Sequence, residues 1–136
     1  MTTACELLET IESSNPSPAQ VVLLISSSQA AFSVSISSID PLVKECAKIV
    51  KERQSLTTHT LKAAYRTIIG SIDVKERLLQ SLINEQMSLR DSKVTIREHE
   101  AELRQLPCQR ELVKLYFKNA MIENGIGDMY NDLWIS

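Results

Sequence analysis

Glycine, proline and aromatic residues are scarce in this chain of 136 residues. It contains three glycines, four prolines and only 4% aromatic residues, whereas serine, leucine, isoleucine and charged residues are abundant. A β-sandwich needs frequent turns and strands rich in β-branched and aromatic residues, so this composition disfavours one. At this length a single domain can bury roughly two-thirds of the surface that its unfolded chain exposes. The composition therefore predicts one all-α domain, residues 1–136.

Cysteine is also rare, and the three that occur lie far apart in the sequence. Cys5, Cys46 and Cys108 are odd in number and lack the C-x-x-C spacing of zinc sites and redox motifs. This pattern suggests neither a disulfide framework nor a metal site, and we expect buried free thiols. Free thiols fit a reducing compartment, so the expected location is the cytoplasm or the nucleus. No cofactor is expected.

Long apolar runs and strong charge of one sign are absent as well. The longest apolar run, 21–25, is far shorter than the roughly 20 residues that span a bilayer. The N-terminus has no positively charged region of the kind that begins a signal peptide. Basic residues are missing before Lys44, and the middle of the chain carries only a small basic excess. We therefore expect no membrane span, and nucleic acid is an unlikely partner because duplex binders concentrate Lys and Arg.

The residues that are present mark several helix starts. The segments 3–6 and 17–20 each form a capping box, and Pro18 takes the favoured first helical position of the second. These signals predict a short helix and a proline-containing hinge within 1–17, followed by bundle helices within 18–69. Residues 30–39 also alternate with a period of two, so helix is favoured there but strand remains an alternative.

The longest uninterrupted helical pattern runs from Asp73 to Leu106. It contains no Gly or Pro and is rich in helix-forming residues, so the sequence predicts one long helix over 73–106. Gly70 is expected to end the preceding helix, and Pro107 to end this one. The remaining segment, 107–136, is expected to form a C-terminal helix that ends at Gly125, followed by an apolar tail that includes Trp134.

The long segment carries the signature of a coiled coil. One row of apolar residues repeats every seven positions and a second row lies beside it; the rows are Leu82, Leu89, Ile96 and Leu103, and Met87, Val94 and Ala101. Such rows indicate helix–helix contact. We expect residues 78–87 to pack on the chain's own 40–69 helix and residues 89–106 to bind a partner's helix.

These patterns favour a non-enzymatic adaptor within a larger complex. No G-x-S-x-G, P-loop or H-E-x-x-H pattern occurs, so no catalytic site is predicted. The predicted partner-binding residues are Leu82, Leu89, Ile96 and Leu103 of the first row, Met87 and Val94 of the second, and Trp134. Trp134 is included because a large aromatic at a chain end often anchors an interface. A polar row between the apolar rows favours a hetero-oligomer with other helical subunits over a symmetric zipper.

One short segment suggests a different function. His59-Thr60-Leu61-Lys62-Ala63, with Gly70 further on, resembles the H-x-L-K-G stretch of histidine phosphotransfer domains, although Ala63 replaces the family's glycine. The resemblance implies a helical bundle that relays a phosphoryl group through His59. Lys62, one turn later, would then stabilise the phosphoryl oxygens.

Overall fold

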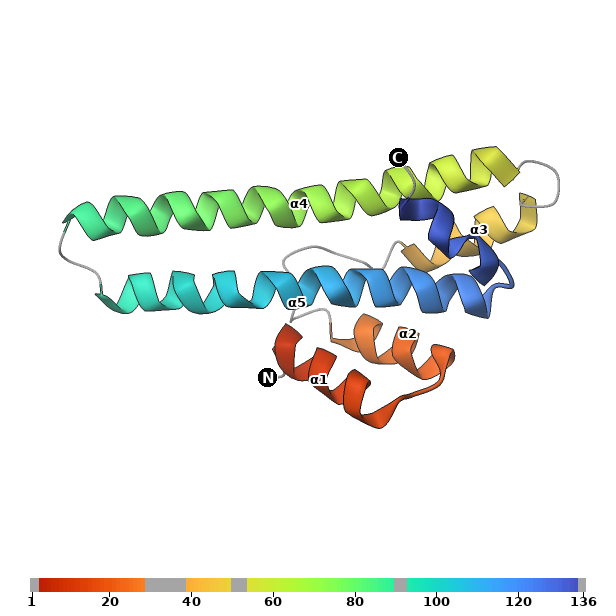
Figure 1. Ribbon diagram of the computed structural model, residues 1–136, viewed down its shortest axis with the longest axis horizontal. Helices are drawn as coiled ribbons and strands as arrows, with labels where there is room; N and C mark the ends of the chain where they lie inside the picture. The colour runs from red at the N-terminus through yellow and green to blue at the C-terminus, as the bar shows by residue number, and fades with distance from the viewer. Residues whose placement is uncertain (1–2, 29–38, 50–53, 90–92, 135–136) are drawn as a thin grey trace.

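The computed structural model describes residues 3–28, 39–49, 54–89 and 93–134, which contain five α-helices and one 3-10 helix (Figure 1). The elements are α1 (Ala4–Ser14), α2 (Pro18–Ser27), α3 (Ile39–Ile49), α4 (Gln54–Leu89), α5 (Lys93–Glu123) and η2 (Gly127–Trp134). No strand occurs within these ranges, so the predicted all-α helical bundle is confirmed. The choice between helix and strand for residues 30–39 concerns positions that, Ile39 apart, lie outside the described residues.

Helices α4 and α5 run antiparallel and form the frame of the molecule. Helices α1 and α2 pack on α5, α3 packs on both long helices, and η2 lies against α5 and α4 (Figure 1). The ends of α4 and α5 nearest to residues 90–92 extend beyond all of these elements. The protein is thus a bundle at one end and a two-helix arm at the other.

The expectation of a single helix over 73–106 is wrong, because this segment belongs to both α4 and α5. Lys75 and Glu102 form a salt bridge, although one continuous helix would separate them by about 40 Å. Asp73 and Arg110 are likewise in contact. The segment therefore pairs with itself as two antiparallel helices. The expected contact of the first half with a separate 40–69 helix is also wrong, since residues 54–89 form one helix.

Two expected helix ends lie within helices instead. Gly70 is inside α4, where its cost of about 1 kcal/mol relative to alanine is offset by the burial of Ile68 and Ile72 on either side. Pro107 is inside α5 on its exposed side. Its cost of about 3 kcal/mol is offset by the burial of Leu106 and Leu112 before and after it.

The capping residues predicted helix starts correctly, whereas Gly70 and Pro107 did not mark helix ends. The Thr3 hydroxyl accepts a hydrogen bond from the Glu6 amide at 3.2 Å, and the Glu6 carboxylate accepts one from the Thr3 amide at 3.4 Å. Ser17 and Gln20 form the same reciprocal pair at the start of α2. Both capping boxes are therefore confirmed, because each depends only on residues within one turn.

The predicted end of α5 at Gly125 is also confirmed. The Ile126 amide donates to the Met121 carbonyl at 2.9 Å and the Gly125 amide to the Ile122 carbonyl at 3.1 Å, which is a Schellman motif. This motif needs a left-handed residue, and Gly125 has φ = 78°. Gly127 then passes so close to Ile122 that a Cβ on it would lie 2.7 Å from the Ile122 Cγ1 atom. The turn directs η2 back onto the bundle.

The expectation of three free thiols holds only for Cys46, which is free and buried. Cys5 in the first turn of α1 and Cys108 in α5 are joined by a disulfide, with Cα atoms 5.1 Å apart. The two cysteines are 103 residues apart in the sequence, so nothing in their local spacing marks them as a pair. Only the packing of α1 on α5 brings them together.

Alkaline pH is expected to unfold the protein. Burial, with a smaller contribution from the Asp40 charge, raises the pKa of Tyr116 to about 12. Burial also raises the pKa of Tyr130 to about 12 and raises that of Tyr65, with nearby charges including Glu111 adding to both. Tyrosines of the unfolded chain ionise near pH 10. Their contribution to stability is therefore complete below about pH 10 and is lost as the pH rises through about 12.

The measurement is a titration of tyrosinate absorbance, with circular dichroism recorded on the same samples. We expect ionisation of the tyrosines and loss of helix to occur together above pH 10. A tyrosine that titrates at its ordinary value while the helices remain intact would contradict the buried positions of these rings.

Candidate functional site: an exposed apolar stripe on α4

The two sides of α4 differ in what covers them. Leu79 and Ile83 on one side are buried, in line with the core residues Leu61 and Ile72 earlier in the helix. On another side, Val74 and Leu78 are 56% and 57% exposed, although both are large apolar side chains. The half-buried Leu82 follows them by one turn. These residues are spaced by four, so they lie along one line on the helix surface.

Two small residues continue this line toward the start of α4. Thr67 and Ser71 are exposed, and their hydroxyls donate to the carbonyls of Ala63 and Thr67 at 2.9 and 3.0 Å. A hydroxyl that already hydrogen-bonds to its own helix needs no hydrogen-bond partner on a neighbouring protein. Its small size also leaves room for a close approach. We call the row formed by Thr67, Ser71, Val74, Leu78 and Leu82 the α4 stripe. It covers about 22 Å, the length of roughly four helical turns.

The stripe lies on α4, and polar contacts with α5 fix the position of α4 along that helix. The Arg110 guanidinium donates from Nε and Nη2 to one Asp73 oxygen, at 3.1 and 2.7 Å, and its Nη2 lies 2.9 Å from a Glu76 carboxylate oxygen. Burial lowers the pKa of Arg110, but the hydrogen bonds and charges of these carboxylates outweigh it and raise the pKa overall. Together with the Lys75–Glu102 salt bridge, these contacts align α4 and α5 along the arm.

The predicted partner-binding residues fall into two groups. Leu82 is on α4, whereas Ile96 and Leu103 are on α5; all three are half-buried, and Leu103 packs against the main core. The heptad row therefore does not continue along one helix. The other predicted residues, Met87, Leu89, Val94 and Trp134, have side chains that lie outside the described residues.

Sequence reasoning missed Val74 and Leu78 as exposed residues. Their spacing of four before Leu82 is visible in the sequence, but the same spacing also fits the buried side of the helix. Helix periodicity defines which residues share a side and does not tell which side is covered. The heptad row was assigned to the partner, and the structure instead leaves Val74 and Leu78 exposed, in line with the first residue of that row, Leu82.

The residues of the phosphotransfer resemblance also lie on α4. His59 is exposed and Lys62, one turn later, is half-buried. Phosphoryl transfer through His59 stays a prediction that these positions do not test.

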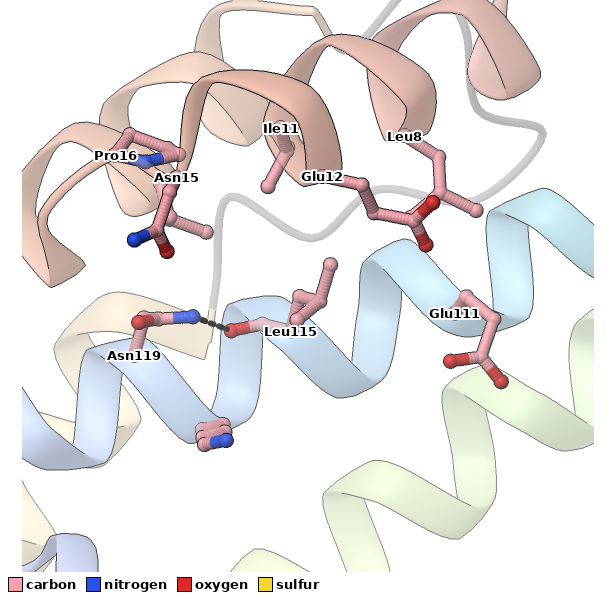
Figure 2. Close-up of a pocket in the computed structure, with 10 residues that line it drawn as sticks. Leu8, Ile11, Glu12, Asn15, Pro16, Glu111, Leu115 and Asn119 are labelled. Atoms are coloured by element: carbon pink, nitrogen blue, oxygen red, sulfur yellow. Dashed lines mark hydrogen bonds between the residues drawn. The ribbon is translucent and has the colours of Figure 1, made fainter.

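A cavity of about 280 Å³ lies on the other side of α5 (Figure 2). Leu8, Glu12 and Asn15 line it from α1 and its C-terminal cap, and Glu111 and Asn119 line it from α5. The Asn119 amide donates to the carbonyl of Leu115, four residues earlier, at 2.7 Å. Among the described residues, the lining contains carboxylates and amides but no histidine, cysteine or serine that could act as a nucleophile or its base. The cavity is a feature of the α1–α5 contact and lacks the groups of an acyl-transfer site.

Within the described ranges, no three His, Cys, Asp or Glu side chains are grouped so that they could hold a metal ion. In the same part of the chain, none of the helices combines the length and the apolar character needed to cross a membrane. The clearest candidate site among the described residues is therefore a surface, the α4 stripe.

Comparison with known proteins does not add to this assignment. No family model, curated protein or solved structure matches the chain. The fold defines the protein as an all-α helical bundle with a projecting two-helix arm, and its function has to be argued from its own residues.

Proposed function

We propose that this protein is a non-enzymatic adaptor subunit of a multiprotein complex, and that it binds a helix of a different protein along the α4 stripe. The observation that carries the proposal is the exposure of Val74 and Leu78 on α4, 56% and 57%, although both are large apolar side chains. Fully burying a Val or Leu side chain contributes about 1.5–3 kcal/mol, so covering these two half-exposed side chains would contribute about that much together.

The shape of the stripe favours a helix as the partner. Its residues are spaced by three or four along four turns, which is the spacing with which one helix presents anchors to another. Thr67 and Ser71 are small, so a neighbouring helix could approach α4 closely at that end. The stripe thus offers large side chains at one end and a shallow surface at the other. This asymmetry favours a different partner protein over a second copy, in keeping with a hetero-oligomer.

The test compares two exposed apolar sites. We expect Val74→Gln/Leu78→Gln to weaken binding of the partner by roughly tenfold to a hundredfold, because one or two times 1.4 kcal/mol of burial is lost. Glutamine is a good helix former, so α4 itself should persist. The matched control is Leu23→Gln on α2, whose side chain is 67% exposed and lies away from the arm. It should bind like the wild type.

The partner is first identified by affinity purification of the tagged chain and mass spectrometry. Each purified candidate is then titrated against wild type, the stripe variant and the control by calorimetry, with helix content checked by circular dichroism. Equal affinity for the wild type and the stripe variant would refute the proposed surface. A chain that melts cooperatively as a monomer and captures no specific partner would refute the adaptor function itself.

A further inference from the structure

The Cys5–Cys108 disulfide is a covalent cross-link between the N-terminal helix and α5. It joins the first turn of α1 to the middle of α5. Both cysteines are half-buried, so neither is sealed inside the core as Cys46 is. Thiol–disulfide exchange requires such access, because a thiolate must attack one sulfur in line with the bond that breaks.

The disulfide holds a helix that could not be stable by itself. Helix α1 has 11 residues, which is too short for an isolated helix in water. Its buried residues, Ala4, Leu7 and Ile11, lie in the core, and α1 packs mainly against α5. Apart from the disulfide, its first turn is attached to α5 by a 3.0 Å hydrogen bond from the Cys5 amide to the Gln105 side-chain oxygen.

We propose that Cys5 and Cys108 form a reversible thiol–disulfide exchange site, whose substrate is a low-molecular-weight thiol, and that its reduction releases α1 from α5. The inference does not depend on the proposed adaptor function. A thiolate of the reductant attacks one protein sulfur, forms a mixed disulfide and displaces the other cysteine as a thiolate, which takes a proton from water. A second reductant thiolate attacks the mixed disulfide and releases the first cysteine. Two electrons pass to the protein, and two reductant thiols become one disulfide.

The third cysteine does not take part in this exchange. Cys46 is on α3 and only 2% exposed. Burial, and then the charge of Glu45, raises the pKa of its thiol, so it forms the reactive thiolate less readily. The exchange is therefore confined to a single pair, and Cys46 serves as an internal control.

Release of α1 would open the contact that contains the cavity of Figure 2. Leu8 follows Cys5 by three residues and Glu111 follows Cys108 by three, so the cavity lies next to the disulfide along the same α1–α5 contact. Reduction would turn this closed contact into an exposed apolar surface made of the buried side of α1 and the side of α5 beneath it. The two redox states would thus present different surfaces to other molecules.

The experiment is hydrogen exchange with mass spectrometry on the full chain, equilibrated in glutathione buffers from fully oxidising to fully reducing. We expect α1 peptides to lose protection by on the order of tenfold or more on reduction, while peptides from the middle of α4 change far less. Alkylation of the denatured protein should count one free thiol in the oxidised form and three in the reduced form. Reoxidation should restore the protection of α1.

Two variants show whether the response comes from thiol–disulfide exchange at Cys5 and Cys108. Cys46→Ala should keep the redox response, whereas Cys5→Ser should show an unprotected α1 in every buffer. The wild-type cycle itself needs no substitution, so poor folding of a variant would not prevent the test. Unchanged protection of α1 in the reduced protein would overturn the proposal. A pair that stays oxidised in the most reducing glutathione buffer, or fails to form a disulfide in the most oxidising one, would overturn it equally.

Discussion

Replacing Cys108 by serine is expected to lower the free energy of unfolding by about 4.7 kcal/mol, the value for a closed loop of about 100 residues. Cys5 and Cys108 are 103 residues apart, so the disulfide restricts nearly the whole unfolded chain. Domains of this size are typically stable by only about 5–15 kcal/mol, and the variant would therefore lose a large share of its stability. The loss arises in the unfolded state, whose chain is no longer cross-linked, and in the folded state, where α1 is held to α5 less firmly.

Urea denaturation under non-oxidising and oxidising conditions measures this effect. The control is wild-type protein reduced before denaturation, which should unfold at the same urea concentration as Cys108→Ser. If oxidised wild type and the variant differ by less than about 1 kcal/mol, the disulfide does not constrain the unfolded chain as the loop length predicts.

Phe117→Ala should have the second largest effect, a loss of about 3–5 kcal/mol. Phe117 on α5 is fully buried, and its ring meets that of Tyr65 on α4 edge to face, with centroids 5.6 Å apart and planes at 87°. Alanine would leave a cavity at the point where the two long helices cross the core, and Tyr65 would lose its aromatic contact. Phe117 belongs to the main core cluster, and protein cores are close-packed, so the gap would close only in part.

Phe117→Leu provides the comparison, since it keeps most of the buried volume and should cost clearly less than the alanine variant. Both are measured by urea denaturation of the oxidised protein. A loss below about 1 kcal/mol for Phe117→Ala would mean that the ring is not in the folding core, and the pairing of α4 with α5 at this position would be wrong.

The parts of the fold that were predictable depend on neighbouring residues. Thr3 and Ser17 bond within their own first turn, and Gly125 supplies a left-handed conformation that few other residues adopt. The all-α class follows from composition in the same way. Gly70 and Pro107 were wrongly expected to end helices. A helix-breaking residue weakens a helix by about 1–3 kcal/mol, and the burial of apolar side chains before and after it can contribute more.

The candidate site was predictable only in part. The heptad rows predicted contact between helices, but a seven-residue repeat has the same form whether the partner is another chain or the same one. The Lys75–Glu102 and Asp73–Arg110 contacts decide that much of it is the same chain. Val74 and Leu78 are exposed because they lie on a side of α4 that this pairing does not cover.

The sequence by itself therefore determined the helical class, the helix starts at Thr3 and Ser17, and the turn at Gly125, because these depend on interactions over one or two turns. Only the tertiary structure decided that 73–106 folds back on itself, that Cys5 meets Cys108, and that Val74 and Leu78 stay exposed. The physical reason is that these features arise between residues distant in sequence, whose approach is governed by the burial of the whole core and leaves no local signal.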